Sequence, residues 1–164
     1  MFLNKIINIL DVISLKLGRL SSLLVLVLIT LIFISVLLRY VFAIGFTWLQ
    51  DLYIWINAIF ILLGIGYTLN KDSHVRIDII YRKLDKGKKK LINFLCSILF
   101  GLPISYLIMS NGFQFFQRSL NLNEGSKETG GLPNIYILKF FIFFMGVLLF
   151  AEILRKILKF FKND

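Results

Sequence analysis

The sequence is poor in the residues that build metal sites and redox centres. It has one histidine, His74, and one cysteine, Cys96, among 164 residues. A single cysteine cannot form an intrachain disulfide, and a metal site needs several clustered His, Cys or carboxylate ligands. A glycine-rich phosphate loop and a GxSxG motif are missing too. We therefore expect no catalytic residue, no cofactor and no bound metal, and we predict that the protein is not an enzyme.

Charged residues are also scarce, at 17% of the chain, whereas 58% of the residues are hydrophobic and the mean hydropathy is +0.82. Soluble proteins typically carry about 25% charged residues. A run of about 20 apolar residues crosses a bilayer as a helix, because lipid forces the backbone polar groups to pair within the segment. Four runs reach this length, and no segment alternates in polarity like a barrel strand. We predict an all-α integral membrane protein, one four-helix domain over 1–164, with spans at about 20–42, 49–69, 91–113 and 135–154.

The segment before the first span is apolar on one side only. Residues 2–17 place apolar side chains at helical spacing, with Lys5, Asn8 and Asp11 elsewhere around the helix. This pattern predicts an amphipathic helix lying in the membrane interface; a plain extension of the first span is the alternative. A signal peptide is the competing interpretation, but the apolar run is longer than about 7–15 residues and lacks a small-residue cleavage site. We interpret it as a retained span.

Basic residues are distributed unevenly around the four runs. Fifteen of the nineteen Lys and Arg residues lie before the first span, between the second and third, or after the fourth. An excess of Lys and Arg marks the cytoplasmic side, so we predict that both termini and the middle loop face inward. The same residues attract anionic lipid head groups. The sequence has no recognition module for nucleic acid, and we expect no nucleic-acid partner.

The middle loop contains a second amphipathic pattern. Ile77, Ile80, Tyr81 and Leu84 form one apolar stripe at helical spacing. We predict a short interfacial helix here, ending near 85–87.

Charged and small residues near the span ends suggest specific contacts. Arg39 and Asp51 bracket the first short connection, which predicts an ion pair unless Arg39 reaches lipid phosphates instead. Glu152 is followed by Arg155 and Lys156, three and four residues later, an expected cluster at the inner interface. In the third span, small residues spaced by four predict a helix-packing seam at Ser97, Gly101 and Ser105. Pro103 predicts a kink.

The interior of the spans lacks carboxylates. A small exporter that works alone usually needs an ionisable group deep in a span to exchange protons for substrate. Independent transport is therefore not expected, although a stand-alone multidrug-type transporter and a membrane anchor for another complex remain alternatives.

Three motifs resemble the small permease subunit (Q-type) of tripartite ATP-independent periplasmic (TRAP) transporters. They are Arg39-Tyr40-Val41-Phe42, Trp48-Leu49-Gln50-Asp51 and, as the most specific, His74-Val75-Arg76-Ile77-Asp78. Gly130-Gly131-Leu132-Pro133 and Tyr67-Thr68-Leu69 are similar to a branch linked with organic-acid uptake. This chain has Gln50-Asp51 where the family often has two acids.

The resemblance implies a three-part importer in the inner membrane of a bacterium or archaeon. A periplasmic binding protein would capture an anionic substrate, usually a carboxylate, and a large subunit would move it with a sodium gradient. The small subunit would act as scaffold and partner of the large subunit, without substrate or sodium sites of its own. For His74, Arg76 and Asp78 we hypothesise a polar network that holds the middle loop in place; solvated loop residues are the alternative.

Overall fold

The computed structural model describes residues 2–71 and 85–162, and all regular elements in these residues are helices. In chain order they are α1 (Phe2–Tyr40), α2 (Thr47–Asn70), α4 (Lys86–Cys96), η1 (Ser97–Gly101), α5 (Leu102–Asn121) and α6 (Tyr136–Lys162). Four helices are long and apolar enough to cross a membrane: Lys5–Tyr40, Thr47–Asn70, Gly87–Asn121 and Tyr136–Phe161. For these residues, the prediction of helices only, four of them capable of crossing a membrane, is confirmed.

The helices are longer than the predicted spans. The third candidate span was expected over 91–113, but its helical residues run from 86 to 121 through α4, η1 and α5. An apolar run indicates only the part of a helix that can lie in hydrocarbon. The helix itself is longer, because backbone hydrogen bonding continues into the polar residues on either side.

α1 joins residues 2–17 and the first span in one helix of 39 residues. This continuity corresponds to the plain extension, and a separate in-plane helix is not confirmed. Gly18 lies at the junction, against the ring of Tyr67 in α2, where a larger side chain would overlap that ring. The second predicted interfacial helix, around 77–84, falls outside the described residues.

The third span changes from α-helix to π-helix before its proline. Ser97–Gly101 forms η1, and Pro103 is among the first residues of α5. Proline has no backbone N–H and its ring crowds the preceding turn, and a π-helical turn is one way in which a helix absorbs such a defect. The irregularity expected at Pro103 therefore lies in the turn before it.

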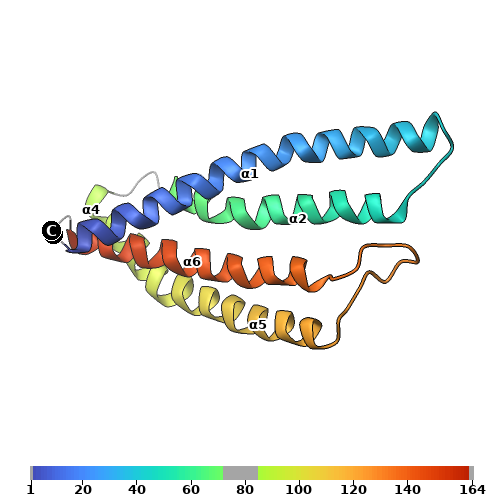
Figure 1. Cartoon of the computed structure of the whole chain (residues 1–164). Helices are drawn as coiled ribbons and strands as arrows, with labels where there is room; N and C mark the ends of the chain where they lie inside the picture. Colours follow the sequence, from blue (N-terminus) through green and yellow to red (C-terminus); the bar gives the residue numbers. More distant parts are fainter. Residues whose placement is uncertain (1, 72–84, 163–164) are drawn as a thin grey trace.

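The long helices lie in a row rather than in a closed bundle (Figure 1). α1 packs mainly on α2, α2 also packs on α6, and α6 packs most extensively on α5, with a smaller contact between α1 and α6. Among the described residues, only five hydrophobic side chains are buried: Ile7, Leu49, Leu63, Leu148 and Ile153. A row leaves two broad apolar faces, which suits a chain surrounded by lipid rather than by water.

Glycines allow α5 and α6 to approach closely. A Cβ atom added to Gly112 would lie 2.9 Å from the Cα of Phe143, and one added to Gly146 would lie 2.7 Å from the Cα of Met109. On α5 the buried residues Ser105, Gly112 and Ser119 recur every seven positions. Small residues let helix backbones pack directly in a membrane, so this heptad stripe forms the α5–α6 contact.

Candidate functional site

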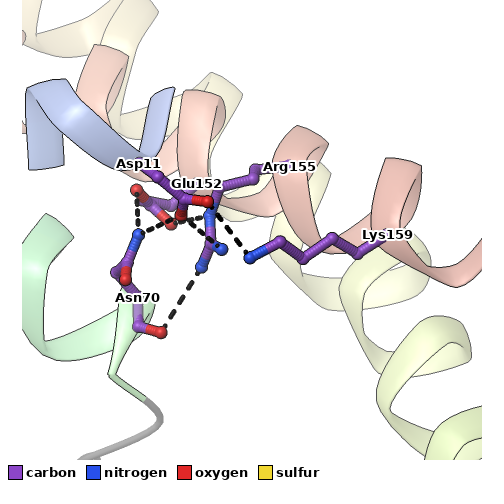
Figure 2. A network of polar contacts seen from close by, with 5 residues as sticks. All are labelled: Asp11, Asn70, Glu152, Arg155 and Lys159. Carbon is purple, nitrogen blue, oxygen red and sulfur yellow. Dashed lines mark hydrogen bonds and ion pairs between the residues drawn. The ribbon is translucent and has the colours of Figure 1, made fainter. Parts of the chain in front are cut away.

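Five polar residues meet where the start of α1, the end of α2 and the end of α6 come together. We call this group, Asp11, Asn70, Glu152, Arg155 and Lys159, the terminal cluster (Figure 2). The Arg155 guanidinium donates from Nε to Glu152 Oε2 at 2.6 Å and from Nη1 to Asp11 Oδ1 at 2.8 Å. Its Nη2 donates to the backbone carbonyl oxygen of Asn70 at 3.4 Å. One arginine thus contacts all three helices.

The remaining contacts complete the terminal cluster. Asn70 Nδ2 donates to Asp11 Oδ1 at 2.9 Å and to Glu152 Oε1 at 3.3 Å. Lys159 Nζ lies 3.3 Å from Asp11 Oδ2. Both carboxylates therefore accept from more than one donor.

Burial differs among the charged members of the terminal cluster. The side chains of Arg155 and Glu152 are only 3% and 4% exposed, whereas those of Asp11 and Lys159 are 29% and 43% exposed. Two acids balance two bases, so the buried charges are compensated, which is the condition for tolerating ions away from water. Because these groups bind one another across α1, α2 and α6, the terminal cluster holds the three helices together.

A second group, the hairpin cluster, lies at the opposite end of α5 and α6 and consists of Ser119, Glu124 and Lys139. Ser119 is fully buried, and its hydroxyl donates to Glu124 Oε2 at 2.6 Å. Lys139 Nζ forms an ion pair with the same oxygen and lies 4.0 Å from the centroid of the Phe115 ring. The hydrogen bond from Lys139, with that from Ser119, lowers the pKa of the Glu124 carboxyl below its ordinary value.

The connection between α5 and α6 is folded back on itself and fixed to α2. The backbone N–H of Ser126 donates to the carbonyl oxygen of Leu132, and the N–H of Ile135 donates to that of Glu124, each at 2.9 Å. Asp51 Oδ2, on α2, accepts the N–H of Leu132 at 2.9 Å. The connection is therefore anchored by a residue far from it in sequence.

Asp51 does not form the ion pair predicted from the sequence. Its carboxylate contacts Leu132 and Gly131, while Arg39 is exposed in the last turn of α1. A side chain at Gly131 would overlap both that carboxylate and the Ser126 hydroxyl, which explains a glycine at this position. The structure thus brings together two of the sequence motifs, the one that contains Asp51 and the one at residues 130–133.

Two further motif residues, Trp48 and Pro133, belong to neither the terminal cluster nor the hairpin cluster. Trp48 is in the first turn of α2, 45% exposed, with its ring centroid 5.9 Å from that of Phe46. Pro133 is exposed in the connection before α6. His74, Arg76 and Asp78 lie outside the described residues, so the network hypothesised for them stays a prediction.

The packing seam predicted at Ser97, Gly101 and Ser105 lines a groove next to the terminal cluster. Gly101 lies against Ile153 of α6, and Ser105 is 1% exposed. With Ser97, both border a groove of about 560 Å³ between the third span and α6. Sequence reasoning missed the tighter contact at Gly112, which the spacing of seven from Ser105 could have indicated.

Within residues 2–71 and 85–162, no group of three or more His, Cys, Asp or Glu side chains is arranged to hold a metal ion. The charged clusters described above pair acids with bases instead.

A family model described as "Tripartite ATP-independent periplasmic transporters, DctQ component" matches residues 28–163. The match covers most of the chain, including four members of the terminal cluster, but not Asp11. A comparison with curated proteins finds no match.

Proposed function

The chain belongs to the DctQ-component family of tripartite ATP-independent periplasmic transporters, and from this premise we propose that it is the scaffold subunit of a sodium-coupled importer of organic acids. As a small TRAP subunit with four membrane-capable helices, it is a multi-pass membrane protein. The family resemblance inferred from the sequence motifs is confirmed. Its family is a transporter-component family and not an enzyme family.

The observation that carries the proposal is the position of the charges. Acidic and basic side chains are missing from 20–38, 52–69, 91–117 and 140–151, the central parts of the four spans. Coupling an ion to a solute usually relies on an ionisable group deep within the membrane. We therefore assign sodium and substrate binding to the large permease subunit and the role of a fixed frame to this chain, which acts as one membrane domain.

We further propose an orientation in the inner membrane of a bacterium or archaeon. Because Lys and Arg are concentrated before the first span, after the fourth and between the second and third, the terminal cluster would lie on the cytoplasmic side. The hairpin cluster and the connection fixed by Asp51 would then face the periplasm. That connection would offer a surface to the solute-binding protein.

Reconstitution tests the proposal. Proteoliposomes would contain this chain with the large subunit, and the binding protein loaded with a radiolabelled organic acid would be added outside. We expect uptake only when all three proteins and an inward sodium gradient are present. Transport of drug cations by this chain alone would favour a stand-alone transporter. Stable assembly with an unrelated complex, and none with the large subunit, would favour a membrane anchor.

A further inference from the structure

Contacts between helices show which residues lie at the same level along the row of helices. Asp51 meets Leu132 at one end of α2, and Asn70 meets Glu152 at the other. Between Asp51 and Asn70 the helix rises about 28 Å, at about 1.5 Å per residue. This length matches the hydrocarbon thickness of about 30 Å, and on this ground we take these two levels as the boundaries of the apolar layer.

The middle of this layer falls at the α5–α6 contact. On α6, the point halfway between the two boundary levels is close to Phe143, whose backbone packs against Gly112 of α5. Asn111 and Gln114 are neighbours of Gly112 along the same helix. They lie within about 3 Å of its depth along the helix axis, close to the centre of the apolar layer.

Asn111 and Gln114 face a groove rather than the α5–α6 contact. The groove, of about 660 Å³, lies between α5 and α6, and Ile142 and Met145 form its α6 side. Asn111, Gln114 and Arg118 line it at i, i+3 and i+7 and are all exposed. Among the described residues, the side chains of these three make no hydrogen bond with one another or with any neighbour.

This surface is poorly suited to lipid. Hydrocarbon offers no hydrogen-bond partner, so an amide left unpaired at mid-depth is energetically costly. A glutamine is too short to reach the interface from the centre, unlike a long basic side chain near a helix end. α1 provides the contrast, because its exposed Thr30 donates to the carbonyl oxygen of Leu26 in its own helix.

We propose that the groove lined by Asn111, Gln114 and Arg118 is the docking site for a membrane-spanning helix of the large permease subunit. That helix would carry amide, hydroxyl or carbonyl groups opposite the two amides and a carboxylate opposite Arg118, nearer the hairpin end. The assignment rests on the proposed function, which requires a membrane partner. Amide side chains join helices in membranes in this way, whereas a lipid cannot hydrogen-bond at mid-depth.

Photocrosslinking in the complete transporter tests the docking site. A benzophenone amino acid would replace Leu107, which lines the groove, or its neighbour Tyr106, which does not. The two positions are matched, with 55% and 58% exposure. In membranes containing all three proteins, we expect an adduct with the large subunit from position 107 and not from position 106.

Substitutions provide a second measurement. We expect the Asn111→Leu/Gln114→Leu variant to retain about fivefold less large subunit during affinity purification, a modest effect because interhelical hydrogen bonds in membranes are individually weak. Gln117→Leu, an exposed amide outside the groove, should retain the wild-type amount. Leucine suits lipid, so protein amount and helicity should be unchanged in both variants.

Several outcomes would overturn the docking site. An adduct with a second copy of this chain, no protein adduct from position 107, or an adduct from position 106 alone would each do so. In those cases, co-purification of the wild-type chain with the large subunit would leave the proposed function intact. Failure of the wild-type chain to co-purify would reject the proposed function and the docking site together.

Discussion

The terminal and hairpin clusters use the same chemistry over very different distances along the chain. In the terminal cluster Arg155 pairs with Asp11 across 144 positions, whereas in the hairpin cluster Lys139 pairs with Glu124 across 15. The first cluster joins three helices, and the second closes the connection between two consecutive helices. Similar ion pairs can therefore fix the whole arrangement of helices or only one connection, depending on which elements they bridge.

Exposure separates the two clusters as well. Glu152 and Arg155 are almost completely buried, while the Glu124 side chain is 35% exposed. Burial raises the penalty for an unpaired charge, and exposure lets water replace a lost partner. We therefore expect substitutions to act globally at the terminal cluster and locally at the hairpin cluster.

The largest effect should come from Arg155→Met. This change leaves the buried Glu152 carboxylate without its cation, and breaking a buried pair in this way costs about 3–5 kcal/mol of unfolding free energy. Lys159→Met is the control, because its half-exposed pair with Asp11 contributes at most about 1 kcal/mol. Unfolding in detergent, followed by circular dichroism, measures both variants. Equal losses would mean that burial does not distinguish the two pairs.

A smaller effect is expected from Glu124→Gln. The amide still accepts from Ser119 and Lys139 but loses the charge attraction, so amide exchange at Ile135, whose N–H bonds the Glu124 carbonyl, should accelerate. The fall in Tm should be smaller than for Arg155→Met. Glu128→Gln, in the same connection, serves as control and should leave exchange at Ile135 unchanged. A Tm as low as that of Arg155→Met would contradict the local role.

The smallest effect concerns pH. Because the folded-state pKa of Glu124 is lowered, this group stabilises the connection above its unfolded pKa, about 4.3, and loses that contribution as pH falls through the folded value. Protection of the Ile135 amide should therefore be constant near neutral pH and decline only in acid. Glu124→Gln should remove this dependence, and a decline already complete at pH 6 would contradict it.

The sequence predicts the four spans well because run length alone decides them. A stretch such as 20–38 has no charge and no helix breaker, so it can only be a helix in lipid. The start of α1 was harder to interpret. An amphipathic segment can lie in the interface or continue a span, and its sequence pattern fits both. The structure shows one continuous helix over Phe2–Tyr40, in which Asp11 contacts α2 and α6.

The polar contacts were predictable only where they are local. Glu152, Arg155 and Lys156 on one helix were predicted as a cluster. The structure pairs Glu152 with Arg155, and the partners on α1 and α2 were not predicted. Asp51 was paired with Arg39 because the two are near in sequence, whereas the structure gives it Leu132, 81 residues away. Local spacing cannot reveal which helix ends meet, because that depends on the order in which the helices pack.

The single row of helices has a consequence for motion within the membrane. Helices packed side by side at about 10 Å spacing form a slab about 40 Å wide and about 10 Å thick. Turning such a slab about the membrane normal displaces more lipid than turning a round bundle of equal mass. Its rotational drag is correspondingly higher, so a domain attached along one face would turn in the membrane more slowly than one attached to a round bundle.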